Sequence, residues 1–152
     1  MLKEALHTAS AAETEAAGAA LAAKMLADQT LPRFVALFGD LGVGKTAFIR
    51  GFASVASPTS LVRSPTFALV NEYARGALPL FHFDMYRIES EEELYAIGFE
   101  DYLARTGIVL VEWSENILSS LPAHYIAVTI AKDNPAIPDS RTVEIEERSM
   151  LC

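Results

Sequence analysis

Residues 36–52 read ALFGDLGVGKTAFIRGF, an apolar run that passes through a glycine-rich turn into a helical pattern. The turn matches G-x-x-x-x-G-K-[ST] at every position, which is the phosphate-binding P-loop pattern. Its residues are Gly39, Asp40, Leu41, Gly42, Val43, Gly44, Lys45 and Thr46. The pattern predicts a site for a nucleoside triphosphate.

The residue types explain the chemistry of this turn. Glycines allow backbone N–H groups to point inward around a phosphate, where Cβ atoms would otherwise stand. Lys45 brings a positive charge to the outer phosphates, and the Thr46 hydroxyl is a ligand for Mg²⁺. The helix that follows directs the N–H groups of its first turn at the same anion.

The flanking residues favour a P-loop over a dinucleotide-binding turn. Residues 33–38 (RFVALF) predict a strand and residues 46–56 (TAFIRGFASVA) predict a helix, the context that the motif requires. Gly39, Gly42 and Gly44 are spaced G-x-x-G-x-G rather than G-x-G-x-x-G, and no acidic residue ends a strand about 20 residues later. A Rossmann-type site is therefore not expected.

Length and composition predict a single domain over residues 1–152. The chain is 51% hydrophobic, enough to bury a core, and no apolar run reaches the roughly 18 residues of a bilayer-spanning helix. The N-terminal MLKEALHTAS carries charge where a signal peptide needs an apolar core, so we expect a cytoplasmic protein. Cys152 is the only cysteine, so neither an internal disulfide nor a cysteine metal site is expected.

The charge balance bears on nucleic-acid binding. Twenty Asp and Glu residues against 12 Lys and Arg residues give a net charge of −8, and the basic residues form no cluster. Nucleic-acid binding draws mainly on the neutralisation of phosphates. If this chain acts on nucleic acid, we expect a partner to hold it.

The hydrophobic patterns predict an α/β fold. Further helices are expected over 7–27 and 89–104, the first starting in a capping box at Ser10 and the second interrupted at Gly98. Further strands are expected at 68–73, 77–84, 107–113, 125–131 and 142–148, the last two alternating like an antiparallel pair. The expected architecture is a single-domain P-loop NTPase-like sandwich with a mixed sheet and a C-terminal antiparallel hairpin.

Two acidic residues stand where apolar strands end. Asp84 follows LPLFHF and Glu112 follows GIVLV, so both are expected at the edge where strand C-termini open toward a ligand. A P-loop enzyme needs a second acid there to hold Mg²⁺ or its waters. The spacing leaves open which of the two touches the metal, and either one alone could be an ordinary strand-end acid.

The segment RSPTF, residues 63–67, precedes the first of these acids. Thr66 lies 20 residues after Thr46, in a proline-stiffened loop that resembles a switch region sensing a γ-phosphate. The alternative is an ordinary turn before a strand. His82 lies within a predicted strand and is expected to serve packing, and Trp113 is either core, the default, or an anchor for a partner.

Several motifs together resemble one known family. GDLGVGKT, SPTF, HFDMYR, ELYAIGFEDYL and VLVEW occur in an order and spacing similar to the TsaE (YjeE) family of bacterial P-loop ATPases, over roughly residues 10–131. The resemblance implies an ATPase, weak alone and activated by partners, that supports the making of threonylcarbamoyladenosine in tRNA. It also implies action with TsaB and with TsaD, the transferase. The tRNA would be contacted only through that complex, and the free chain would be monomeric.

The resemblance also implies roles for individual residues. It places ATP in the Gly39–Thr46 loop, where Lys45 stabilises charge, and Mg²⁺ on Thr46 and Glu112. Asp84 would act from the opposite side and orient the attacking water or a metal-bound water.

Three further positions follow from the same resemblance. Ser64 and Thr66 would form the mobile switch loop, and Thr14 would approach the adenine. The chain departs from the family's usual pattern at Ser114, where Pro is frequent, which leaves the turn after Glu112 undetermined.

The sequence gives less support to three other functions of P-loop proteins. A small-molecule kinase needs an arginine-bearing lid, and the arginines here are scattered. A GTPase needs an N-K-x-D element, whereas IAKDNP puts Lys132 and Asp133 side by side. A nucleotide-dependent scaffold without hydrolysis is disfavoured by the two strand-end acids.

Overall fold

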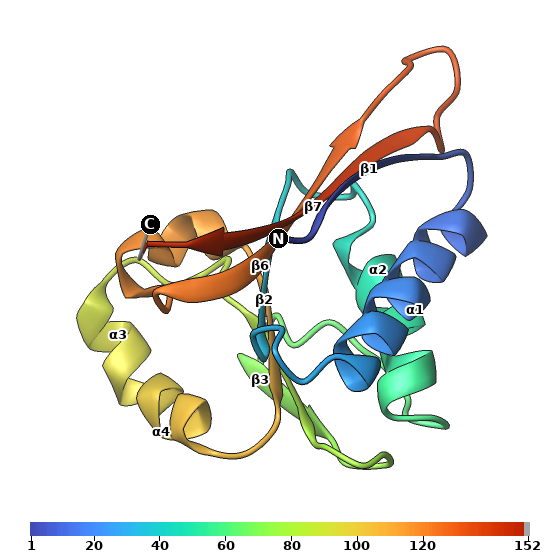
Figure 1. Ribbon diagram of the computed structural model, residues 1–152. Coiled ribbons are helices and arrows are strands. Elements are labelled where there is room, and N and C mark those ends of the chain that lie inside the picture. Colours follow the sequence, from blue (N-terminus) through green and yellow to red (C-terminus); the bar gives the residue numbers. More distant parts are fainter. Residues whose placement is uncertain (151–152) are drawn as a thin grey trace.

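The structure of the protein is a computed structural model that describes residues 1–150, so the terminal thiol of Cys152 lies outside the described residues. A single sheet has helices on both of its faces (Figure 1). The elements are β1 (Lys3–Thr8), α1 (Ala11–Ala27), β2 (Phe34–Phe38), α2 (Lys45–Ala56), β3 (Val70–Tyr73), β4 (Leu80–Asp84), α3 (Glu91–Ala96), α4 (Phe99–Ala104), β5 (Ile108–Glu112), the 3₁₀ helix η1 (Ser114–Ser120), β6 (His124–Lys132) and β7 (Arg141–Ser149). None of the helices in this part of the chain has the length and hydropathy that crossing a bilayer requires.

The sheet is mixed, as predicted. Its seven strands run in the order β1-β7-β6-β2-β5-β4-β3. Strands β6, β2, β5 and β4 are parallel to one another, whereas β1 with β7, β7 with β6, and β3 with β4 pair antiparallel. The pairing of β6 with β7 confirms the C-terminal hairpin. The C-terminal ends of the parallel strands therefore meet at one edge, the upper end of the molecule in Figure 1.

Two hydrophobic cores lie on opposite faces of this sheet. Helices α1 and α2 cover one face, and α3, α4 and η1 cover the other (Figure 1). Phe48 and Phe52 of α2 are fully buried on the first face. On the second face the ring of Phe99 meets Phe34 and Phe83 edge to face, with centroids 6.2 and 5.2 Å apart. Because central parallel strands are buried on both sides, their sequences read as continuous apolar runs.

Helix starts follow the capping signals. The hydroxyl oxygens of Ser10 and Ser90 accept hydrogen bonds from the backbone N–H groups of Glu13 and Glu93, at 3.1 and 3.2 Å. Gly98 adopts a left-handed φ of 76° between α3 and α4. That conformation suits glycine and confirms the predicted interruption.

Two elements were not predicted from the sequence. Strand β1 is an edge strand in which Lys3, Ala5 and His7 are exposed and Leu6 is half-buried, so its apolar pattern is weak. Its backbone pairing with β7 holds it in place, and Leu6 lies opposite Val143. The 3₁₀ helix η1 has no periodicity long enough to predict. Both elements nevertheless border the upper end of the molecule, where β1 ends and η1 begins.

Helices α1 and α2 cross at very short range through two glycines. A Cβ atom added to Gly51 would stand 1.7 Å from the carbonyl oxygen of Glu15, and one added to Gly18 would stand 2.0 Å from that of Phe48. The backbone of each helix thus occupies the space that a side chain would need at the glycine of the other helix. This crossing fixes α2, whose first turn forms the end of the P-loop.

Replacing Gly51 by alanine should therefore destabilise the protein. We expect the free energy of unfolding to fall by about 3 kcal/mol, because overpacking forces backbone shifts at the crossing. In an open helix the same change would raise stability by roughly 0.5–1 kcal/mol, so the sign of the effect is diagnostic. The measurement is denaturant unfolding, with Glu15→Ala as the control, since it removes a surface side chain but keeps the Glu15 carbonyl. A Gly51→Ala protein as stable as the original chain would contradict the close crossing.

Candidate functional site

The P-loop connects β2 to α2 at the upper edge of the sheet. Gly44 precedes α2 and has φ of 110°, a left-handed value that residues with a side chain rarely adopt. Gly39 has φ of 145°, and a Cβ atom there would lie 2.4 Å from the carbonyl oxygen of Ile130 on β6. Glycine is required at both positions for the chain to turn over the strand end and leave the N-terminus of α2 facing the loop.

Lys45, the first residue of α2, is buried under the P-loop. Its side-chain ammonium donates to the carbonyl of Gly39 and lies 3.8 Å from the centre of the Trp113 ring. Burial lowers the pKa of Lys45, while the nearby carboxylates, Glu115 and Glu112 first among them, oppose that effect. A bound phosphate would supply the negative charge that favours the ammonium form, so this lysine is suited to an anionic ligand.

The two strand-end acids lie next to each other and are both buried. Asp84 of β4 and Glu112 of β5 are register partners in the parallel sheet. The Thr46 hydroxyl donates to Oε1 of Glu112 at 3.2 Å. Glu112 thus faces the P-loop threonine, as the predicted metal ligands require.

Asp84 is held by a different set of donors. Its Oδ2 accepts hydrogen bonds from the hydroxyls of Ser64 and Thr66, at 3.4 and 3.1 Å, and its Oδ1 accepts one from the backbone N–H of Tyr86 at 2.9 Å. The predicted switch residues therefore contact an acid of the site in this structure. The two acids have distinct surroundings, one on the P-loop side and one on the side of residues 64–66.

The oxygen donors here fit a magnesium ion. Mg²⁺ prefers hard oxygen ligands and, with nucleotides, is held by one or two carboxylates while phosphates and waters supply the rest. The adjacent Thr46 hydroxyl and Glu112 carboxylate provide such donors. No cluster of three or more His, Cys, Asp or Glu residues within positions 1–150 is arranged to bind a metal by itself.

These residues line a cavity of about 330 Å³. Its lining consists of Leu41, Gly42, Gly44, Lys45, Thr46, Ser64, Thr66, Asp84, Tyr86, Glu112 and Trp113. The rings of Tyr86 and Trp113 form one wall, with centroids 5.0 Å apart. Trp113 is half-buried, so it packs against the second core and also faces the cavity.

The turn after Glu112 is formed without proline. Trp113 adopts a left-handed φ of 57°, and the buried Ser114 hydroxyl donates to the carbonyl of Val111 at 2.9 Å. A side-chain hydrogen bond thus stabilises the chain reversal that follows Glu112.

Four of the predicted binding residues do not line the cavity: Thr14, Gly39, Asp40 and Val43. Thr14 is buried behind the P-loop, where its hydroxyl is 2.8 Å from that of Thr8 and its methyl group faces Gly44. The other three belong to the P-loop and shape it through their backbones.

Two residues that sequence reasoning missed hold the P-loop backbone. Glu115 accepts a hydrogen bond from the Gly39 N–H at 3.0 Å, and Arg141 of β7 donates through Nε to the Val43 carbonyl at 2.8 Å. Neither belongs to a recognisable motif, and both reach the loop only through the tertiary fold. The structure therefore adds a support for the P-loop on each side.

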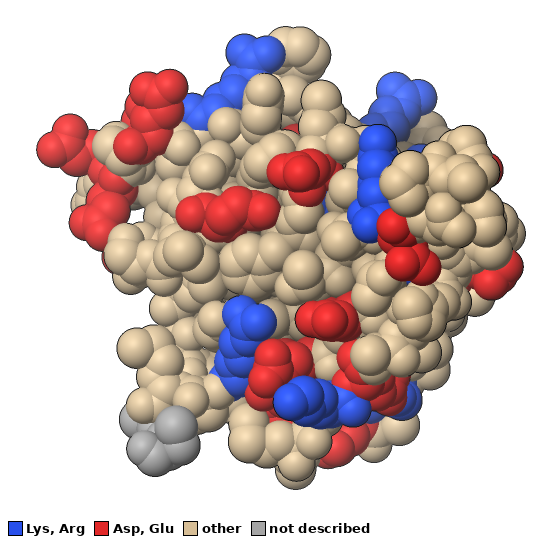
Figure 2. Space-filling view, turned by 90° about the horizontal axis from the view of Figure 1, so that it is seen from above, with Lys and Arg blue, Asp and Glu red and all other residues tan. Residues whose placement is uncertain are grey.

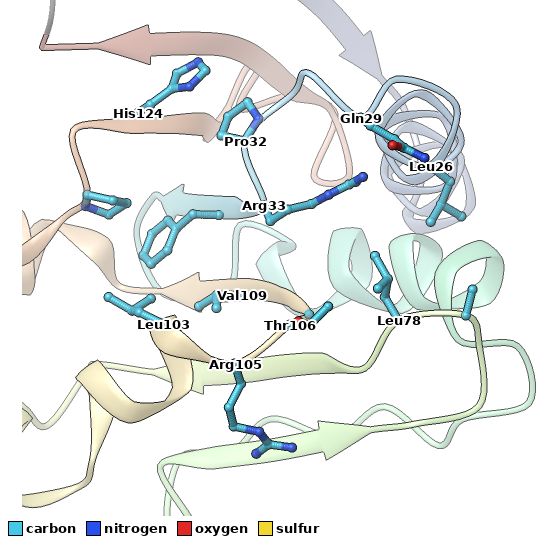
Figure 3. A pocket seen from close by; sticks show the side chains of 14 residues that line it. Leu26, Gln29, Pro32, Arg33, Leu78, Leu103, Arg105, Thr106, Val109 and His124 are labelled. Carbon is cyan, nitrogen blue, oxygen red and sulfur yellow. The ribbon is translucent and has the colours of Figure 1, made fainter.

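A larger cavity, of about 830 Å³, lies at the opposite edge of the sheet (Figure 3). Arg33 there donates to the Met25 carbonyl at 2.6 Å, and Arg105 points toward β3 and pairs with Glu72 at 3.0 and 3.3 Å. Its arginines are thus engaged by the protein itself. The smaller cavity combines a lysine, a helix N-terminus and acids, so it is the better site for a metal–phosphate ligand.

The charged side chains at the upper end do not form a basic surface. Figure 2 looks down on that end, and the Lys and Arg side chains there stand in separate groups among acidic and uncharged residues. This agrees with the net charge of −8. The exposed face around the site offers no extended track for a nucleic-acid backbone.

Comparison with known proteins gives consistent matches. The family model described as Threonylcarbamoyl adenosine biosynthesis protein TsaE matches residues 8–143. A protein of Bacillus subtilis (strain 168) named tRNA threonylcarbamoyladenosine biosynthesis protein TsaE is 44% identical over 96 residues, which cover 63% of this chain and 60% of that protein. A protein of the same name from Haemophilus influenzae is 40% identical over 117 residues, which cover 77% of this chain and 72% of that protein.

A solved structure is similar over nearly the whole chain. The crystal structure of YdiB from Bacillus subtilis superposes with a TM-score of 0.77 at 30% sequence identity, covering 97% of this chain and 86% of that one. The mixed sheet and its helical layers are therefore shared with that protein.

Proposed function

Because the chain belongs to the TsaE family, we propose that it is a Mg²⁺-dependent ATPase that supports the formation of threonylcarbamoyladenosine in tRNA. The assignment to this pathway rests on the names of the related proteins. The proposal of ATPase activity rests on the geometry of the site. One observation carries it: the P-loop threonine and two buried strand-end acids face a single cavity.

Each group of residues in the site has its own role in ATP hydrolysis. The N–H groups of the P-loop and of the first turn of α2 bind the phosphates, and Lys45 balances their charge. Thr46 and Glu112 would hold Mg²⁺, which when bound neutralises negative charge on the phosphate oxygens. Asp84, whose position is set by its three donors, accepts a hydrogen bond from the attacking water and orients it.

The segment around Ser64 and Thr66 is proposed to act as the switch. Both hydroxyls now bind Asp84, and a γ-phosphate in the same cavity would compete for these donors. We place the adenine near the start of α1, where Thr14 supports Gly44 from behind. Both assignments rest on the family resemblance together with these contacts.

We propose TsaB and TsaD as the partners and a monomer as the free state. The acidic, dispersed surface charge supports indirect contact with tRNA, because phosphate neutralisation would have to come from other subunits. The ATPase would then reset or activate the complex, and TsaD would perform the transfer.

The test is ATP hydrolysis by the purified chain, alone and with TsaB, TsaD and tRNA from the same organism. We expect slow turnover alone and marked stimulation by the partners, abolished by Lys45→Ala. Turnover that ignores the partners but requires a small acceptor would indicate a kinase, and a preference for GTP would indicate a GTPase. Either result would contradict the proposal.

A further inference from the structure

His82 makes two hydrogen bonds in the interior of the sheet, although a histidine within a strand is usually a packing residue. Its side chain is fully buried on β4, on the face covered by α1 and α2. Nε2 lies 2.6 Å from Oε2 of Glu112, and Nδ1 lies 2.9 Å from the hydroxyl of Tyr73 on β3. Leu80, Ile108 and Leu110 belong to the same core. An apolar side chain could fill this space without the cost of burying polar atoms, so packing does not account for the pair.

The Tyr73 hydroxyl continues the contacts to the backbone of the 63–67 segment. It lies 3.3 Å from the backbone nitrogen of Arg63 and 3.2 Å from its carbonyl oxygen. That carbonyl already accepts a hydrogen bond from Nδ2 of Asn71, at 2.9 Å. The Tyr73 hydroxyl is therefore within hydrogen-bonding distance of both the Arg63 backbone and His82.

The direction of the hydrogen bond between His82 and Glu112 follows from the groups that can donate. A carboxylate only accepts, so His82 must present an N–H from Nε2 to Glu112. Nδ1 of the same ring lies 2.9 Å from the Tyr73 hydroxyl, within hydrogen-bonding distance. A continuous series of contacts thus runs from the backbone of Arg63 through Tyr73 and His82 to Glu112.

We propose that Tyr73 and His82 are positioning residues that connect Glu112 to the backbone of Arg63, and so connect the predicted metal site to the switch segment. The inference rests on the proposed ATPase function. Ser64 and Thr66 bind Asp84, so this segment is attached to both acids by separate contacts. A change in the orientation of Glu112 on nucleotide binding is thereby passed to the segment that touches Asp84.

Tyr73→Phe tests this connection, because it removes one hydroxyl and keeps the buried ring. Residues that orient metal ligands from behind typically affect activity by 10- to 100-fold, so we expect kcat for ATP hydrolysis to fall about tenfold with KM unchanged. Two control variants distinguish the loss of this connection from a general destabilisation of the protein. Tyr102→Phe removes a hydroxyl on the other face of the sheet. Asn71→Ala removes the second side-chain contact to Arg63, and it should cost less turnover than Tyr73→Phe.

A second readout needs neither nucleotide nor activity. Amide hydrogen exchange at residues 63–67 should become faster when Glu112 is replaced by alanine, and this response should vanish in the Tyr73→Phe background. A tyrosine that only packs would leave the response intact. Unchanged kcat in Tyr73→Phe together with an intact exchange response would overturn the inference. Absence of ATP hydrolysis in the original chain would instead reject the proposed function, and the exchange experiment would still decide whether the connection exists.

Discussion

Lys45→Ala should lower ATP turnover by about a thousandfold or more, because among residues 1–150 it removes the only Lys or Arg side chain that lines the P-loop cavity. The burial that lowers the pKa of Lys45 also makes its ammonium effective, since few waters compete with a phosphate for it. The measurement is steady-state release of phosphate with saturating ATP and Mg²⁺.

The control for this prediction is Lys132→Ala, which removes an exposed lysine on β6 and should leave turnover unchanged. Nucleotide binding can be followed in parallel through the fluorescence of the single tryptophan, Trp113, which faces the same cavity. A Lys45→Ala protein with near-original turnover would remove the assignment of this loop as the phosphate site.

Substituting either buried acid should lower turnover by about a hundredfold while nucleotide affinity changes little. Glu112→Gln and Asp84→Asn keep the shape of each side chain and remove its charge. The two variants should differ in their dependence on Mg²⁺, because only Glu112 contacts the P-loop threonine. We expect Glu112→Gln to raise the Mg²⁺ concentration for half-maximal turnover and Asp84→Asn to leave it unchanged.

A titration of turnover against Mg²⁺ at fixed ATP checks this prediction. Glu100→Gln, a substitution of an exposed acid on α4, is the control and should behave like the original chain. A raised requirement for Mg²⁺ in Asp84→Asn alone would exchange the roles of the two acids. Unchanged turnover in both variants would make them ordinary residues at the ends of strands.

The elements that could be predicted from the sequence are those with a strong pattern. The P-loop helix, the buried strands and the interruption at Gly98 all follow from apolar periodicity and from local signals, and the structure confirms them. Strand β1 could not be predicted, because its six residues draw their order from β7 rather than from their own side chains. Edge strands of this kind have little local signal.

The candidate site likewise contains residues that the sequence predicts and residues that it does not. Lys45, Thr46, Asp84 and Glu112 were predicted from motif spacing, and the structure brings them to one cavity, although their chemical roles stay predictions. His82 was assigned to packing because a sequence shows no partner for a strand histidine, whereas the neighbouring strand supplies Glu112. Contacts such as these depend on strand register, which local sequence patterns do not encode.

The pairing of β1 with β7 has a consequence for co-translational folding. Residues 3–8 leave the ribosome long before residues 141–146, with which they pair in the sheet. Strand β1 therefore stays unpaired while the residues between it and β7 are synthesised, and it joins the sheet only once β7 is present. Arg141, which holds the Val43 carbonyl of the P-loop, arrives with that same strand. A nascent chain stalled before position 141 would thus carry the whole P-loop and Glu115 but would lack Arg141, the other side chain that supports the loop.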